Sequence, residues 1–185
     1  FLLYAKDISV GIIDPTSLTS SIKIEVQPPQ PDQFLSALNY SSSISDYLDS
    51  LKPKDPDYLY LQLELQKLLL SEKKPSKFTM VPDKTTLEDG MSHPNIIPLR
   101  AKLKELGYLE TARESESFDE ELMKAVMLFQ ENSGLNADGE VGRKTIHALN
   151  VPIQTRIIQV LVNLERMRWL NFDLGNHYII VNQPN

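Results

Sequence analysis

The sequence contains no cysteine among its 185 residues. This absence excludes disulfide bonds, thiolate metal ligands and a cysteine nucleophile within the chain. It also fits an oxidising envelope compartment. The chain has no basic block either: its net charge is −6, and no run of lysine or arginine stands out. Because proteins that bind nucleic acid normally carry a basic surface, we expect no nucleic-acid partner.

Long hydrophobic runs are lacking as well. No apolar stretch approaches the roughly 20 residues that span a bilayer, so the sequence predicts no transmembrane segment. The chain starts at Phe1 instead of methionine, and no signal-peptide pattern precedes it. We therefore expect a fragment of a longer protein. Its apolar and charged fractions, 41% and 24%, are typical of a globular chain with one domain or two small ones.

Few side chains suggest chemistry. The three histidines, His93, His147 and His177, have no metal-binding spacing, so we expect neither a metal ion nor a cofactor. Glu120 and Glu121 are adjacent, and on a helix they point about 100° apart, which is unsuitable for an acid–base pair. They are better explained as acids in the first turn of a helix.

Residues 118–150 carry the most tightly specified pattern. Asp119 predicts the N-cap of a helix, and Gly134 predicts its left-handed end. Between them, apolar residues repeat along one helical face: Leu122, Val126 and Phe129. A turn at Asp138-Gly139 then leads into a second helix, with predicted buried positions at Ile146 and Leu149.

The preceding residues predict one more helix of the same small domain. It starts near Pro94, ends at Gly107 and carries four apolar residues: Ile97, Leu99, Leu103 and Leu106. Tyr108 is placed to fold back toward the helix end. Residues 73–91 change character to Lys, Pro, Ser, Thr and Asp, which predicts a linker.

Two longer helices flank this small domain. Residues 57–72 have leucines on more than one side, namely Leu59, Leu63 and Leu70, and Leu61, Leu65 and Leu68. We expect this helix to be packed on two sides. The other helix runs from Pro152 to about Trp169. There we favour a packed Trp169, with Arg166 and Arg168 paired to acids, over a basic-aromatic ligand patch.

The small domain resembles the peptidoglycan-binding-like domain, a three-helix bundle attached to bacterial wall enzymes. The matching residues are Gly107-Tyr108-Leu109, Phe118-Asp119, Phe129-Gln130, Gly134-Leu135, Asp138-Gly139-Glu140-Val141-Gly142 and Thr145. The resemblance implies peptidoglycan, through its glycan strand or stem peptide, as the partner. We expect a shallow groove with hydrogen-bonding groups and one aromatic ring. The candidate ligand-binding residues are Tyr108, Gln130, Asp138 and Thr145. For Asp138, a structural role in its turn is the alternative.

A second resemblance covers nearly the whole chain. Residues 150–152, the run from Asn163 to Leu170 and the run from Tyr178 to Asn182 resemble the large Gram-negative L,D-transpeptidases, as do residues 1–15 and 47–65. In that family a helical scaffold precedes the peptidoglycan-binding-like domain and is completed by the helix after it. A β catalytic domain with His and Cys follows. Asn171 replaces the proline that the family commonly has.

These resemblances predict a mainly α fold. Residues 1–90 and 151–172 would form the scaffold, 91–150 an inserted three-helix bundle, and 173–185 the first strand of an absent catalytic domain.

The chain itself would have no catalytic residue, because acyl transfer needs a thiolate activated by histidine. We expect a periplasmic or envelope protein of a Gram-negative bacterium that positions peptidoglycan for 3-3 cross-linking and contacts its own catalytic domain. The alternatives are a spacer that orients this domain without binding glycan, and, less favoured, part of another wall enzyme such as an amidase.

Overall fold

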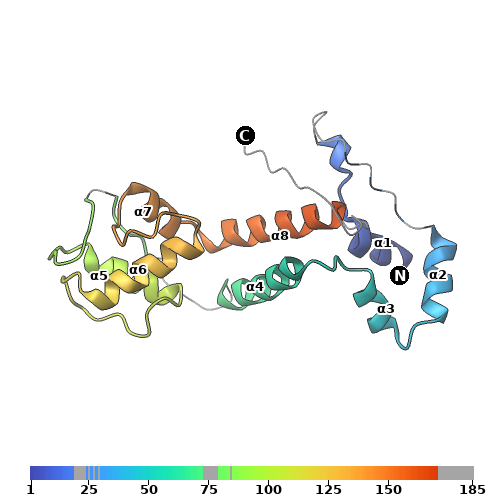
Figure 1. Cartoon of the computed structure of the whole chain (residues 1–185), viewed down its shortest axis with the longest axis horizontal. Coiled ribbons are helices and arrows are strands. Elements are labelled where there is room, and N and C mark those ends of the chain that lie inside the picture. The colour runs from blue at the N-terminus through green and yellow to red at the C-terminus, as the bar shows by residue number, and fades with distance from the viewer. Residues whose placement is uncertain are drawn as a thin grey trace. The chain divides into compact units, whose positions relative to one another are not determined.

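The computed structural model describes residues 1–18, 24, 26, 28, 30–72, 79–83 and 85–170. These residues form eight α-helices and one short 3₁₀ helix and contain no strand, which confirms the predicted mainly α fold (Figure 1). The predicted strand within 173–185 lies outside the described residues. The helices are α1 (Leu2–Val10), η1 (Pro15–Ser17), α2 (Pro31–Asn39), α3 (Ile44–Ser50), α4 (Pro56–Glu72), α5 (Ile96–Glu105), α6 (Glu120–Asn132), α7 (Arg143–Leu149) and α8 (Ile153–Trp169).

The chain divides into two compact units. Unit 2 comprises Glu72–Arg156, and unit 1 comprises Phe1–Ser71 together with the chain from Ile157 onward. Unit 2 is therefore inserted between two parts of unit 1, and α8 begins in unit 2 and ends in unit 1. The domain boundaries predicted at residues 90, 150 and 172 stay predictions.

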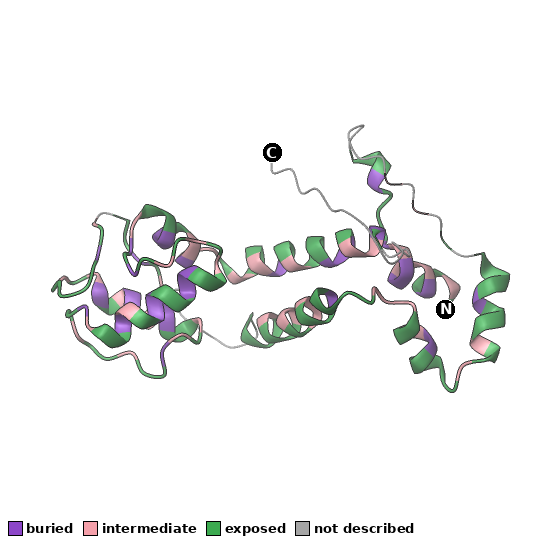
Figure 2. Cartoon of the chain, in the orientation of Figure 1, coloured by how far each residue is buried: buried purple, intermediate pink, exposed green. Residues whose placement is uncertain are grey.

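Unit 2 contains the larger hydrophobic core. Helices α5, α6 and α7 each contribute buried apolar residues to it, and Figure 2 colours the buried positions along the ribbon. The predicted stripe of α6 is buried, as are Ile146 and Leu149 of α7. In α5, Ile96, Leu99 and Leu103 are fully buried, whereas Ile97 is 36% exposed. The core comprises Val81, Leu87, Ile96, Leu99, Leu103, Leu109, Phe118, Leu122, Ala125, Val126, Phe129, Val141, Ile146 and Leu149.

The helix ends of unit 2 follow from local sequence chemistry. Asp119 caps α6 by accepting a hydrogen bond from the Leu122 N–H at 2.9 Å, as predicted. Gly107 and Gly134 both have left-handed φ, at 83° and 67°. The residue after Gly107, Tyr108, donates its N–H to the Leu103 carbonyl at 2.8 Å, so the chain folds back over the end of α5.

The segment predicted as a linker contributes to unit 2. Val81 and Leu87 are both 1% exposed and belong to its core. Leu87 pairs with Val141 through two backbone hydrogen bonds, of 2.8 and 3.3 Å. The side chain of Asn150 bonds both the N–H and the carbonyl of Val81, at 2.9 and 2.8 Å. The composition of this segment suggested a linker because it has few large apolar residues. The two that join the core, Val81 and Leu87, contact residues far along the chain, so local sequence does not reveal their role.

Unit 1 has a much smaller core. One buried cluster consists of Ala5, Phe34 and Tyr47, from α1, α2 and α3. In α4 only Tyr58 is buried, while Leu61, Leu65 and Leu68 are half-buried. The opposite side of α4 is exposed, so the expectation that this helix is packed on two sides was wrong for the described chain.

The end of α8 is held by one carboxylate. Glu165, 8% exposed, accepts hydrogen bonds from the Ile12 and Ile13 N–H groups and from the Trp169 indole at 3.3 Å. Arg168 pairs with Glu165 at 3.1 Å and donates to the Tyr58 hydroxyl at 3.0 Å. This agrees with the predicted packing of Trp169 and with the predicted acidic partner of Arg168, whereas Arg166 is exposed and has no acidic partner among the described residues.

Candidate functional site

Three of the four candidate binding residues meet in unit 2. Gln130 lies on α6 and is 1% exposed. Its Nε2 donates to Asp138 Oδ1 and to the Glu140 carbonyl, both at 2.9 Å, and lies 3.2 Å from Thr145 Oγ1. Its Oε1 accepts a hydrogen bond from the Gly139 N–H at 2.9 Å. Both polar atoms of Gln130 are therefore occupied within the protein.

This arrangement makes Gln130 the anchor of the 138–140 turn. A buried side-chain amide whose nitrogen and oxygen are both hydrogen-bonded holds the backbone around it in place. Breaking one of these hydrogen bonds would leave a buried polar group without a partner, which costs free energy. Thr145, 5% exposed, adds a hydrogen bond from its hydroxyl to the Glu140 carbonyl at 3.3 Å. Gln130 and Thr145 thus hold the 138–140 turn in place from the buried side, and neither side chain faces solvent.

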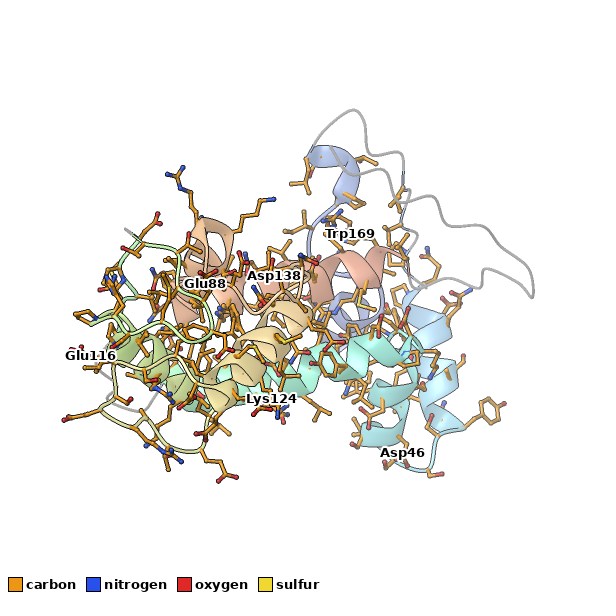
Figure 3. All side chains as sticks on the ribbon, turned by 60° about the vertical axis from the view of Figure 1, so that its left-hand side comes forward. Asp46, Glu88, Glu116, Lys124, Asp138 and Trp169 are labelled. Carbon is orange, nitrogen blue, oxygen red and sulfur yellow. The ribbon has the colours of Figure 1, made fainter. Side chains whose placement is uncertain are left out.

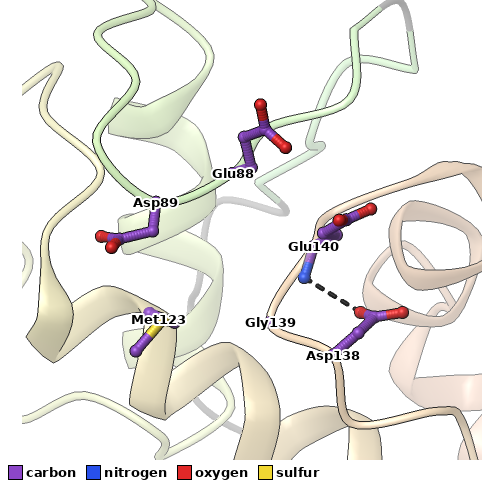
Figure 4. A pocket seen from close by; sticks show the side chains of 6 residues that line it. All are labelled: Glu88, Asp89, Met123, Asp138, Gly139 and Glu140. Carbon is purple, nitrogen blue, oxygen red and sulfur yellow. Dashed lines mark hydrogen bonds between the residues drawn. The ribbon is translucent and has the colours of Figure 1, made fainter.

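Asp138 is the exposed member of the group. Its Oδ1 accepts a hydrogen bond from the Glu140 N–H at 3.0 Å (Figure 4). Oδ1 also accepts from Gln130, and Oδ2 accepts from Asn136 at 3.1 Å. These hydrogen bonds, led by the one from the Glu140 N–H, hold the pKa of Asp138 below its ordinary value. Asp138 therefore stays ionised in a fixed orientation, consistent with the structural role considered from the sequence.

Tyr108 stands apart from this group. Its ring meets the Phe129 ring edge-on, with centroids 5.4 Å apart and planes at 88°. Its hydroxyl oxygen lies 3.4 Å from Asn132 Nδ2. Tyr108 is half-buried and mainly closes the end of α5 against the core.

A shallow pocket lies beside the anchored turn. It has a volume of about 210 Å³ and lies between the 88–89 loop, the start of α6 and the 138–140 turn (Figure 4). Four of its six lining residues are acidic, and all of these carboxylates reach solvent. Carboxylates accept hydrogen bonds from hydroxyl, amide and ammonium groups. The lining residues are Glu88, Asp89, Met123, Asp138, Gly139 and Glu140.

The pocket differs from the expected groove in two respects. Its lining includes no aromatic ring, and among the four candidates only Asp138 lines it. Glu88 and Asp89 were not predicted as site residues, because they lie in the segment assigned to a linker. The backbone pairing of Leu87 with Val141 brings them to the turn. Glu140 was visible in the motif, but nothing in its spacing marked it as part of a pocket.

The remaining chemical candidates are structural where the structure describes them. Nδ1 of His93 accepts from the Asn95 N–H at 3.1 Å before α5, and His147 is exposed on α7, whereas His177 lies outside the described residues. Among the described residues, no group of three or more His, Asp or Glu is placed to hold a metal ion. Glu120 pairs with Lys124, which is labelled in Figure 3, at 2.6 Å. Glu121 pairs with Arg113 at 3.5 Å. These two acids therefore act as surface charges near the start of α6.

Two parts of the chain match models of known domain families. Residues 92–149 match the family model described as "Putative peptidoglycan binding domain". This match covers about a third of the chain. Residues 1–65 match the Scaffold domain family. The two family descriptions name a binding module and a scaffold module.

Two curated relatives match a shorter stretch. Each is named "Probable CtpA-like serine protease", from Staphylococcus epidermidis strains ATCC 35984 and ATCC 12228, and each is 32% identical over 76 residues. The match covers 41% of this chain but only 15% of each relative. Within the described residues, no helix has the length and apolar character needed to cross a membrane.

Proposed function

We propose that this chain is the peptidoglycan-recognition and scaffold portion of a murein L,D-transpeptidase that forms 3-3 cross-links. The observation that carries the proposal is the order of the two families, the scaffold domain at 1–65 before the peptidoglycan-binding domain at 92–149. The return of α8 to unit 1 supports it, because Glu165 completes a scaffold that the inserted domain interrupts. The sequence runs 163–170 and 178–182, which resemble the transpeptidase pattern, point to the same parent.

The cross-linking reaction belongs to the rest of that parent. Acyl transfer of this class needs a cysteine thiolate with a histidine base, and the 185 residues hold no cysteine. The function of this chain is then to hold peptidoglycan near the catalytic domain, in the periplasm of a Gram-negative bacterium. The protease relatives share too small a part of their length with this chain to suggest their activity for it.

We place the peptidoglycan contact at the acidic pocket of unit 2. Gln130 already fixes the 138–140 turn that lines this pocket, so binding a ligand there costs little conformational entropy of the protein. Its carboxylates accept hydrogen bonds from sugar hydroxyls, from amides and from free amino groups of stem peptides. If a charged amine contributes, added salt weakens the binding.

The second candidate function is a spacer that orients the catalytic domain without binding glycan. It is favoured by the absence of an aromatic ring in the pocket and by the internal use of Gln130. Co-sedimentation with protein-free sacculi at several salt concentrations separates the two. Retention of the chain supports recognition, whereas no retention at any salt concentration favours the spacer.

A further inference from the structure

Helix α4 carries an exposed seam with coiled-coil spacing. Leu59, Leu63 and Leu70 are 60%, 49% and 64% exposed. Together with exposed Gln66, they are spaced by four, three and four residues. This is the spacing of the a and d positions of a heptad repeat, at which two helices meet. We call these four residues the α4 seam.

The α4 seam is distinct from the side of α4 that packs within the chain. That inner side consists of Tyr58, which is buried, and of half-buried Leu61, Leu65 and Leu68. At 100° per residue, these four positions lie across the helix from the seam. Packing inside unit 1 therefore leaves the seam uncovered, although its composition is that of an interface.

We propose that the α4 seam packs antiparallel against the same seam of a second copy of this chain. The spacing of four, three and four reads the same in both directions, so a two-fold axis between positions 64 and 65 brings the two seams into register. Leu59 then lies opposite the partner's Leu70, and Leu63 lies opposite the partner's Gln66. A self-complementary patch of this kind gives a closed, isologous dimer.

The flanking side chains favour the antiparallel pairing. Tyr60 and Lys67 lie beside the seam at equivalent heptad positions, and such positions face each other in an antiparallel pair. Both reach solvent, with Tyr60 63% exposed and the Lys67 side chain 69% exposed. Each Lys67 therefore lies near the partner's Tyr60, which permits two symmetric cation–π contacts. A parallel pair would place Lys67 near the partner's Gln62 instead.

The dimer should be weak, because the seam spans fewer than two heptads and includes one polar residue. Sedimentation velocity from about 5 to about 500 µM covers the affinities expected for so short a seam. We expect the sedimentation coefficient of the wild type to rise with concentration. Leu63→Glu should remain monomeric, with unchanged helical circular dichroism because the position is exposed. Leu161→Glu, at a 48% exposed leucine of α8, is the matched control and should still dimerise.

The absence of cysteine makes the register directly testable. Leu59→Cys and Leu70→Cys variants, mixed and oxidised, should form a disulfide-linked dimer. Each variant alone should not, since 11 residues of helix separate like positions by about 16 Å and a disulfide needs Cα atoms within about 7 Å. Strong cross-linking of each variant alone would overturn the antiparallel register. A wild type that stays monomeric throughout would overturn the proposal. No peptidoglycan is present, so these outcomes are independent of the proposed wall binding.

Discussion

Glu165 accepts a hydrogen bond from the Ile12 N–H at 2.6 Å, across 153 positions of the chain. The same Oε1 accepts the Ile13 N–H at 2.8 Å. Everything that forms unit 2 lies between these partners in the sequence. The contact therefore joins the start of unit 1 to the helix that returns after the inserted domain.

Removing this carboxylate should destabilise unit 1. Glu165→Ala leaves two backbone N–H groups and the Trp169 indole without their acceptor, so we expect a loss of about 2–4 kcal/mol in the free energy of unfolding. Glu165→Gln keeps one acceptor oxygen and should lose less. Trp169 is the only tryptophan, so urea unfolding followed by its fluorescence reports on unit 1. Arg166→Ala, an exposed neighbour, is the control. Equal midpoints for Glu165→Ala and Arg166→Ala would refute this role.

Gly11 should be coupled to Glu165. Gly11 has φ 89°, and a Cβ there would clash with Glu165 Oε1. We expect Gly11→Ala to destabilise unit 1 through both the left-handed backbone and the clash. In the Glu165→Ala background the clash is gone, so the cost of Gly11→Ala should fall by about 1 kcal/mol or more. A double-mutant cycle with strictly additive costs would show that the two positions are independent.

Gln130→Ala should release the 138–140 turn. The substitution leaves the Gly139 N–H and the Glu140 carbonyl without their partner, at an expected cost of about 2–3 kcal/mol. Hydrogen exchange at the Gly139 amide measures the effect, and it should accelerate strongly. Gln130→Glu keeps the acceptor but sets a charge against Asp138, so its defect should ease at low pH. Asn132→Ala, an exposed position on the same helix, serves as the reference. Unchanged protection of Gly139 in Gln130→Ala would contradict the anchoring role.

Asp119 should make unit 2 sensitive to acid. Desolvation raises the pKa of Asp119, but the Leu122 N–H and the Arg100 guanidinium, 2.5 Å away, outweigh it and lower the pKa overall. A depressed pKa means that the stabilisation is complete above the unfolded pKa of about 3.9 and is lost as the pH falls through the folded pKa.

The variant Asp119→Asn isolates this charge while keeping a capping side chain. Because the Asp119 carboxylate is 38% exposed, solvent screens the pair and we expect a loss of only about 1 kcal/mol at pH 7. The difference in stability between variant and wild type should shrink below about pH 4. Circular dichroism during urea unfolding at a series of pH values measures it. A constant difference down to pH 2 would show that the charge of Asp119 has no part in it.

Local signals predicted the helices well. Asp119, Gly107 and Gly134 act within a few residues of their own positions, so their roles could be predicted from spacing alone. The buried face of α5 was harder to predict from the sequence. Pro94 and Pro98 allow the helix to start at several positions, and Ile96 and Ile97 are both apolar. Only the packed core decides which of the two isoleucines is buried.

The site depended on contacts that local sequence does not encode. Gln130 was expected to face a ligand, but the 138–140 turn comes back over α6 and uses its amide. Glu88 and Asp89 reach the pocket only because Leu87 pairs with Val141, 54 positions later. Polar residues in a motif can serve either a ligand or the fold, and the sequence of one chain does not separate these roles.

The most direct test of the central claim is co-sedimentation of pocket variants with protein-free sacculi. The pocket variant is Asp89→Asn with Glu140→Gln, and the control is Glu114→Gln with Glu131→Gln, which removes two exposed charges of unit 2 outside the pocket. We predict that the wild type and the control are retained, and that the pocket variant binds about tenfold or more weakly, corresponding to at least 1.4 kcal/mol. A wild type that stays in the supernatant, or a pocket variant retained as well as the control, would contradict peptidoglycan recognition at this pocket.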